Sequence, residues 1–210
     1  MSDLNTALRL QSDAVEMLAL RARLLLEAGD VAAATRDVDT ALGLPGGDEI
    51  PELHLLRGRI LANNNDLDGA VTALRNALQL NSSLGDASYY LAVVAKAQGN
   101  EQERMKRLDH ATGFADGLLR AEAHYERGDY HYSKEDYRAA QADFEKALKH
   151  NPDHVLAHEY RGRVREALGD FDGALADYEA YLRLGGAKLY KDEKEIQRRI
   201  KEARKSSKKR

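Results

Sequence analysis

The chain of 210 residues is 43% hydrophobic and 32% charged, with a formal net charge of −3, which is typical of a folded protein with a large exposed surface. It has no cysteine, which excludes disulfides and thiolate metal sites. Its apolar runs are shorter than the roughly 18 residues of a membrane-spanning helix, and its first residues lack the pattern of a secretory signal. We therefore expect a cytoplasmic protein, with the nucleus as the alternative compartment.

The first residues of the chain match the end of a unit that recurs later. The segment ALRLQSD, residues 7–13, aligns with ALKHNPD, residues 147–153, and Leu4 falls on the position of Phe144. Residues 1–14 are therefore predicted to form a partial repeat helix or a cap. A natural half-repeat and a cut from a longer array both explain this segment, and the missing first helix favours the cut.

From residue 15 the chain divides into five segments of 34 or 36 residues, each with two amphipathic helical patterns around a short polar turn. The segments are residues 15–50, 51–84, 85–120, 121–154 and 155–188. Small residues recur where the two helices of a segment must cross: Ala22, Ala34, Gly58, Ala70, Ala92, Gly128, Ala140, Gly162 and Ala174. The third segment departs most from the pattern, because Arg104 replaces the small alanine, and we expect the loosest packing there.

A helix–turn–helix repeat of about 34 residues with these small and turn positions resembles the tetratricopeptide repeat (TPR). The resemblance covers about residues 15–188 and is specific in spacing, although His124, Arg127 and His131 stand where the family has Trp, Leu and Tyr. It implies an all-α fold: a right-handed superhelical solenoid of five TPR helix–turn–helix repeats with a C-terminal capping helix.

Residues 189–210 are predicted to form that basic capping helix and a tail, with the helix running from Lys188 to about Lys205. The apolar residues expected to cover the last repeat are Leu189, Ile196, Ile200 and Ala203. Residues 188–210 hold 11 Lys or Arg and 4 Asp or Glu, whereas the rest of the chain holds 21 and 31. The repeats are therefore acidic and the end of the chain is basic.

An arginine recurs seven residues into four of the five segments, as Arg21, Arg57, Arg127 and Arg161. Three of these segments also carry an aspartate sixteen residues after the arginine: Asp37, Asp143 and Asp177. Because this spacing follows the repeat, we predict an ion pair between the two helices of each of these segments. The alternative is an arginine ladder that binds an acidic partner.

The TPR family binds its ligands in a concave groove lined by the first helices of the repeats. The corresponding positions of this chain give the predicted peptide-binding groove: Leu20, Arg23, Leu55, Leu56, Arg59, Tyr89, Tyr90, Tyr125, Tyr160 and Arg163. Tyrosines suit recognition because they combine apolar area with a hydroxyl. We expect Leu55 and the tyrosines to be partly exposed on one strip; the alternative is that the tyrosines pack between neighbouring first helices.

No pattern in the sequence indicates catalysis, a cofactor or a metal. The seven histidines form no metal-binding motif, and neither a nucleophile elbow nor a phosphate loop is present. The family's carboxylate clamp for Hsp70 and Hsp90 tails needs a lysine at the fifth repeat position. This chain has Ala19, Leu55, Tyr89, Tyr125 and Glu159 there, so no carboxylate clamp is predicted.

The resemblance thus implies a non-enzymatic scaffold that binds a protein or peptide partner. Residues 196–210 are similar to the stretch that joins TPR arrays to the J-domain in co-chaperones, which suggests a co-chaperone that holds client segments. The alternative is an adaptor that binds nucleic acid or an anionic surface through the basic C-terminal helix. Nucleic acid is the less favoured partner, because Tyr190 is the only aromatic residue of the basic segment. An engineered array without a natural ligand is the last option.

Overall fold

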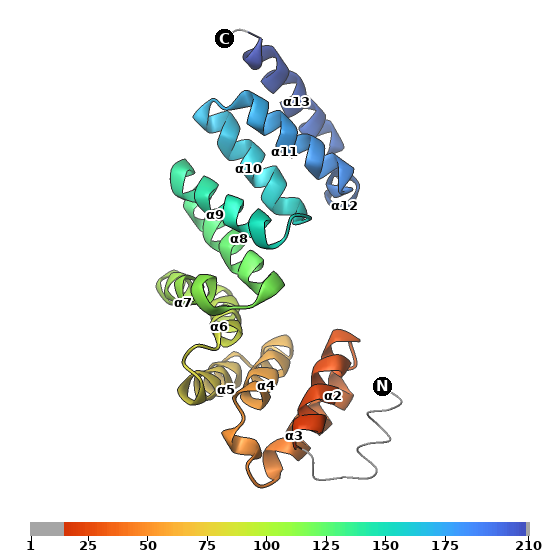
Figure 1. Ribbon diagram of the computed structural model, residues 1–210, viewed down its shortest axis with the longest axis vertical. Helices are drawn as coiled ribbons and strands as arrows, with labels where there is room; N and C mark the ends of the chain where they lie inside the picture. Colours follow the sequence, from red (N-terminus) through yellow and green to blue (C-terminus); the bar gives the residue numbers. More distant parts are fainter. Residues whose placement is uncertain (1–14, 209–210) are drawn as a thin grey trace. The chain divides into compact units, whose positions relative to one another are not determined.

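The computed structural model describes residues 15–208, and every secondary-structure element in that range is helical (Figure 1). The elements are α2 (Val15–Glu27), α3 (Val31–Gly43), the 3₁₀ helix η1 (Gly47–Glu49), α4 (Pro51–Asn63), α5 (Leu67–Leu80), α6 (Gly85–Ala97), α7 (Glu101–Phe114), α8 (Gly117–Ser133), α9 (Tyr137–His150), α10 (Val155–Leu168), α11 (Phe171–Arg183), α12 (Gly186–Tyr190) and α13 (Glu193–Ser207). They form two compact units, Met1–Ala115 and Asp116–Arg210, which we call the N-terminal unit and the C-terminal unit.

Consecutive helices pair into the helix–turn–helix repeats that the sequence predicts. Helix α2 packs on α3, α4 on α5, α6 on α7, α8 on α9 and α10 on α11, and the two helices of a pair lie side by side (Figure 1). The predicted all-α repeat fold is therefore confirmed. The predicted partial repeat at residues 1–14 lies outside the described residues. Within residues 15–208, no helix is long and apolar enough to cross a membrane.

The turn inside each described repeat depends on two consecutive residues. The first has a positive φ of 60–82°, a conformation that glycine adopts without strain. The second is the N-cap of the next helix, and its side chain accepts a hydrogen bond of 2.9–3.2 Å from the backbone N–H three residues later. The five turns of residues 15–208 use Gly29-Asp30, Asn65-Asp66, Gly99-Asn100, Glu135-Asp136 and Gly169-Asp170. The two turn residues therefore recur because the backbone requires a positive φ at the first position and an N-cap side chain at the second.

The core of the N-terminal unit consists mainly of alanine, leucine and valine. Gly58 lies where α4 crosses α5, and a Cβ atom at this position would be 2.5 Å from Cγ of Leu74. The missing side chain lets the two helices approach closely. Pro51 is in the first turn of α4, as the sequence predicts, because proline lacks the N–H that this position leaves unpaired.

The core of the C-terminal unit uses larger side chains in the same frame. Phe144 and Tyr178 are fully buried, and they face Gly128 and Gly162. A Cβ atom at these glycines would lie 2.8 Å and 2.7 Å from the Cε1 atoms of the two rings. The predicted crossing alanines of this unit, Ala140 and Ala174, are also fully buried.

The end of the C-terminal unit is covered by α13, but the predicted single helix is broken at Lys191, which has a φ of 60°. Ile196, Ile200 and Ala203 are buried as expected, whereas Leu189 is 66% exposed. The placement of Leu189 on the covering face is wrong, because the break at Lys191 takes it out of the helical register of α13.

Candidate functional site

Within residues 15–208, the predicted ion pairs form in every repeat that carries both the arginine and the aspartate. Each guanidinium donates from Nε and Nη2 to both carboxylate oxygens, at 2.6–2.9 Å. The pairs are Arg21–Asp37, Arg127–Asp143 and Arg161–Asp177. Because the aspartates are buried between the two helices of their repeat, these arginines stabilise the repeats. The prediction of within-repeat pairs is confirmed, and the arginine ladder loses its support.

In the C-terminal unit a histidine joins each of these aspartates. Nδ1 of His124 lies 3.0 Å from Oδ1 of Asp143, and Nδ1 of His158 lies 3.2 Å from Oδ1 of Asp177. Burial favours the neutral form of both carboxyls. Hydrogen bonds from the histidine and the arginine outweigh burial and hold the pKa of Asp143 and of Asp177 below the usual value. Both aspartates are therefore ionised at neutral pH.

Two of the predicted groove residues belong to the core of the N-terminal unit. Leu55 and Leu56 are 8% and 4% exposed, so the expectation that Leu55 is partly exposed is wrong. Leu55 packs with Leu74 of α5 and Leu91 of α6, and Leu56 packs with Val38 of α3. Helix α4 lies between the helices of the preceding repeat and those of the following one. Consecutive residues on it therefore pack against different neighbours, and both leucines become buried.

The other predicted residues of the N-terminal unit reach the surface. Leu20 is 39% exposed and Arg23 is exposed on α2. The guanidinium carbon of Arg59 lies 5.0 Å from the centroid of the Tyr90 ring, and Tyr89 contacts Tyr90 edge to face at 5.4 Å. Burial raises the pKa of Tyr90, so its hydroxyl keeps its proton at neutral pH.

Aromatic side chains gather on three consecutive helices of the C-terminal unit, α8, α9 and α10. We call Tyr125 and Tyr132 of α8, Tyr137 of α9 and Tyr160 of α10 the tyrosine cluster. The centroid of the Tyr160 ring lies 6.0 Å from that of Tyr125 and 5.5 Å from that of Tyr132, both edge to face. All four side chains pack against the core around Phe144 and are partly exposed. The cluster thus has a core beneath it and solvent on its outer side.

The electrostatic environment of the cluster is acidic. Burial raises the pKa of Tyr125, and the negative charges of Asp129, Glu126 and Glu159 raise it further. Burial and Asp129 likewise raise the pKa of Tyr160. Both phenols therefore remain protonated at neutral pH and can donate hydrogen bonds.

One cation lies at the edge of the cluster. The guanidinium carbon of Arg163 is 5.4 Å from the centroid of Tyr160, and Arg163 also forms an ion pair with Glu159 on the preceding turn of α10. Because Glu159 is 3% exposed, the pair is partly removed from solvent.

Comparison with known families identifies the repeats. A family model for the tetratricopeptide repeat matches residues 55–103 and 125–187, which is more than half of the chain. This chain is a tetratricopeptide repeat protein. A search of curated proteins found no match.

Solved structures share the fold of this TPR protein at low sequence identity. PilF of Pseudomonas aeruginosa aligns with a TM-score of 0.73 and 16% identity, over 90% of this chain and 89% of that chain. PilW, described as a widely conserved type IV pilus biogenesis factor, aligns with a TM-score of 0.66 and 16% identity, over 91% and 90%. YrrB, described as a TPR protein with an unusual peptide-binding site, gives 0.58 and 17%, over 86% and 91%. At these identities the similarity shows the fold alone.

The TPR fold suggests a scaffold for protein–protein interactions, and proteins of this family are generally not enzymes. Among the described residues, no group of three or more metal-ligating side chains could hold an ion. The absence of a carboxylate clamp for Hsp70 and Hsp90 tails stays a prediction from the sequence, because the comparisons do not test it.

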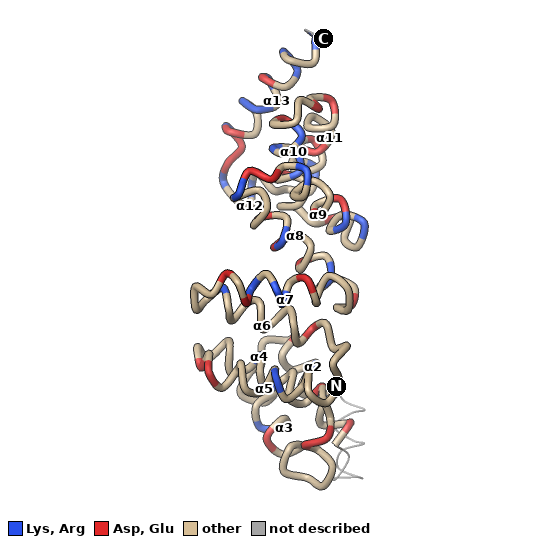
Figure 2. The backbone as a smooth tube through the Cα atoms, turned by 90° about the vertical axis from the view of Figure 1, so that its left-hand side faces the viewer, with Lys and Arg blue, Asp and Glu red and all other residues tan. Residues whose placement is uncertain are grey.

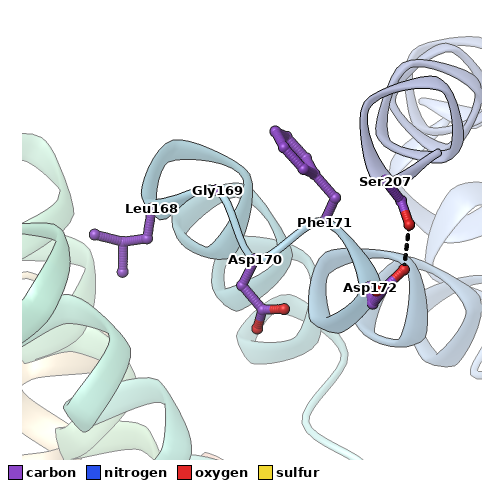
Figure 3. A pocket seen from close by; sticks show the side chains of 6 residues that line it. All are labelled: Leu168, Gly169, Asp170, Phe171, Asp172 and Ser207. Carbon is purple, nitrogen blue, oxygen red and sulfur yellow. Dashed lines mark hydrogen bonds between the residues drawn. The ribbon is translucent and has the colours of Figure 1, made fainter. Parts of the chain in front are cut away.

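A small surface pocket of about 320 Å³ lies where α11 of the TPR protein begins (Figure 3). Its lining residues are Leu168, Gly169, Asp170, Phe171, Asp172 and Ser207. The hydroxyl of Ser207 donates a hydrogen bond of 2.6 Å to Oδ1 of Asp172, as the dashed line in Figure 3 shows. This hydrogen bond connects the last residue of α13 with the first turn of α11.

The basic side chains of α13 are in part neutralised by nearby carboxylates. A few acidic residues lie among the basic ones near the end of the chain (Figure 2). The ion pairs are Arg198 with Glu195 and Glu202, Arg199 with Glu166 and Glu195, and Arg204 with Glu179, at 2.8–3.3 Å. Pairs that tie α13 to α10 and α11 leave less positive charge for an external polyanion, which disfavours the adaptor model.

Sequence reasoning missed two members of the tyrosine cluster, Tyr132 and Tyr137, and one neighbour. Tyr132 comes seven residues after Tyr125, so helical periodicity alone places both on one face of α8. His154 lies with its ring 4.6 Å from that of Tyr125, and its Nδ1 caps α10 by accepting from the N–H of Ala157. No periodic signal identifies this histidine, because it acts from a turn.

Proposed function

We propose that this TPR protein is a non-enzymatic scaffold that docks a peptide segment of a partner protein on the tyrosine cluster. The observation that carries the proposal is the cluster itself. Tyr125, Tyr132 and Tyr160 come from two neighbouring first helices and remain partly exposed, and the ring of Tyr160 contacts each of the other two edge to face. Such an aromatic surface is unusual on a soluble protein unless something binds it.

The cluster has the properties of an interaction hot spot. Binding energy concentrates in tyrosines that are anchored on a packed core, because their rings lose little conformational entropy when they become buried. Tyr125 and Tyr160 each lie 6.0 Å from the ring of buried Phe144, which holds them in place. Protonated hydroxyls at the rim can donate to the backbone carbonyls of an extended segment.

The comparisons support the class of function but not the partner. Of the three solved structures, YrrB is described as having a peptide-binding site, and that description applies to YrrB. The co-chaperone role and the cytoplasmic compartment stay predictions from the sequence, without a supporting feature among residues 15–208. The anionic-surface adaptor is less favoured, because arginines of α13 are paired within the unit.

A selection of binding peptides followed by mutation tests the proposal. Phage carrying random 12-residue peptides (a length of about 40 Å when extended) would be selected on the full chain, and the enriched peptides labelled for fluorescence anisotropy. We expect Tyr125→Leu with Tyr160→Leu to weaken binding at least about tenfold, a loss of about 1.4 kcal/mol, with an unchanged helical circular dichroism signal.

The matched control replaces Tyr130, which also lies on α8. Because Tyr130 is two residues before Tyr132, its side chain points to the opposite side of the helix. Tyr130→Leu should leave binding within about twofold. Selected peptides that bind equally well to the double variant would place the docking site elsewhere and refute the proposal.

A further inference from the structure

We propose that residues 1–14, which lie outside the described residues, dock as a short helix on an apolar face of α2. This face belongs to the N-terminal unit, so it is independent of peptide docking on the tyrosine cluster. Two observations carry the proposal. Apolar side chains of α2 are less buried than their counterparts in later repeats, and the sequence before Val15 matches the helices that cover those counterparts.

The apolar face of α2 is a stripe of three side chains. Met17, Leu20 and Leu24 are three and four residues apart, so they lie on one side of the helix. Leu20 is 39% exposed, and Met17 and Leu24 are partly exposed. An apolar stripe on a helix normally faces a packed neighbour, which indicates that a further element covers α2.

The same positions are buried in the later first helices that pack on a preceding second helix. Met17 is the third residue of its repeat segment and Leu24 is the tenth. At the boundaries α3–α4, α5–α6 and α9–α10, where the two helices pack on each other, the third and tenth residues are 0–3% exposed. These residues are Leu53 and Ile60, Ala87 and Val94, and Ala157 and Val164. Within residues 15–208, no second helix precedes α2.

Two repeat boundaries show which side chains cover the tenth position. They lie eleven and eight residues before the start of the next repeat segment, and they share a core cluster with the residue that they cover. The covering residues are Leu74 and Ala77 of α5 for Val94, and Phe144 and Ala147 of α9 for Val164. The residues at the same two distances before Val15 are Leu4 and Ala7. An apolar and a small side chain therefore stand where the stripe of α2 requires them.

The length of the segment also fits. Helices α5 and α9 end at Leu80 and His150, in both cases five residues before the next first helix begins. The same spacing ends the docked helix at Leu10 and leaves room for about two turns before it. A helix this short is not stable alone in water, so it forms by packing on α2. Because four residues connect it to α2, its effective concentration at the face is about millimolar, which favours it over a helix of another molecule.

Thiol labelling measures whether the face is covered, because the chain has no cysteine of its own. Leu24→Cys places a single thiol in the apolar stripe. Adding Leu4→Asp puts a charge at the covering position. We expect this second change to raise the labelling rate of the thiol at least about fivefold, since a carboxylate cannot be buried against the stripe.

The matched control is Asn5→Asp, which adds the same charge one residue later. The corresponding residues of α5 and α9, Arg75 and Glu145, are exposed, so this change should alter the labelling rate less than about twofold. Thr40→Cys, at an exposed position of α3, reports any general change in reactivity and should label equally fast with and without Leu4→Asp.

Hydrogen exchange on the chain without substitutions gives a second measure. The amides of residues 7–10 should exchange at least about tenfold more slowly than in an unstructured peptide, because they are hydrogen-bonded in the docked helix. Leu4→Asp should remove this protection.

Three outcomes would overturn the proposal. Unprotected amides at residues 7–10, with equal labelling in all backgrounds, would mean that the face of α2 is open. Equal effects of Leu4→Asp and Asn5→Asp would mean that the segment does not dock through Leu4. Protection that is lost on about hundredfold dilution would show that a second copy of the chain covers the face.

Discussion

The N-terminal and C-terminal units use one repeat frame but fill it with different side chains. At equivalent helix crossings, a glycine of the first helix faces a leucine in the N-terminal unit and an aromatic ring in the C-terminal unit. These contacts are Gly58 with Leu74, Gly128 with Phe144 and Gly162 with Tyr178. The comparison shows that the small residue fixes the crossing, whereas the facing residue can vary in size. In the C-terminal unit the aromatic core extends outward into the tyrosine cluster.

The same two units differ in their buried charge. Asp37 of the N-terminal unit accepts hydrogen bonds from Nε and Nη2 of Arg21. Asp177 of the C-terminal unit accepts from Arg161 and Arg165, and it also lies next to a nitrogen of His158. Because unpaired buried charges are costly, the C-terminal unit should depend more strongly on its aspartates.

The largest effect should follow the removal of Asp177. Asp177→Ala leaves two arginines and a histidine without their shared carboxylate, and removing one partner of a buried pair costs about 3–5 kcal/mol. Asp37→Ala should cost clearly less, because it leaves a single arginine whose side chain is 26% exposed and can reach water. Urea unfolding with hydrogen exchange mass spectrometry measures the two units separately. Equal losses in the two units would show that the extra partners of Asp177 add nothing.

The next effect concerns the tight helix crossing between α8 and α9. Ala140→Leu should overpack it and destabilise the C-terminal unit by about 1–3 kcal/mol, because Ala140 is fully buried beside the ring of Phe144. Ala142→Leu, at an exposed position two residues later, is the control and should change stability by less than about 0.5 kcal/mol. An unchanged melting temperature for Ala140→Leu would mean that the crossing tolerates the added volume.

The fold could be predicted from these positions because crossing and turn geometry act within a single repeat. Ala140, Asp143 and the Glu135-Asp136 turn lie within ten residues of one another, so their pattern appears directly in the sequence. Leu55 was misassigned because its burial depends on α6, which belongs to the next repeat. The break at Lys191 was missed because a non-glycine residue with a positive φ has no local sequence signal.

The candidate site was only partly predictable for a related reason. Family spacing indicates that Tyr125 and Tyr160 lie on first helices, but the sequence alone leaves open whether they are core or surface. In the structure both side chains are partly exposed: one side packs against the core around Phe144 and the rest is accessible to solvent. Their acidic surroundings arise from α8 and α10 together, and the pairing of Arg163 with Glu159 depends on side-chain conformation that a sequence does not specify.

Acid titration sharpens the comparison of buried charge. The pKa of Asp143 and of Asp177 is lower in the folded protein than in an unfolded chain, where it is about 3.9. Their stabilisation is therefore complete above about pH 4–5 and is lost as the pH falls through the lowered folded pKa. The expected effect is smaller than that of Asp177→Ala, because a protonated carboxyl can still accept hydrogen bonds.

The measurement is the free energy of unfolding of the C-terminal unit between pH 5 and pH 2.5, in wild type and in Asp143→Asn. The variant removes the contribution of Asp143 and keeps that of Asp177, so its curve should be flatter in this range. Equal slopes for the two proteins would show that Asp143 does not contribute to the acid sensitivity.

The smallest effect should come from the last helical turn of α13. The hydrogen bond of 2.6 Å from Ser207 to Asp172 connects the end of this helix to α11 (Figure 3). Ser207→Ala removes the donor at a partly exposed site, where a hydrogen bond contributes about 0.5–1.5 kcal/mol, and it leaves Asp172 in contact with water. Because Ile196 and Ile200 still bury the earlier turns, we expect faster amide exchange only near the end of α13 and no change in the N-terminal unit. Ser206→Ala, one residue earlier, is the matched control and should leave exchange unchanged. Faster exchange throughout α13 would instead mean that this single hydrogen bond holds the whole helix on the last repeat.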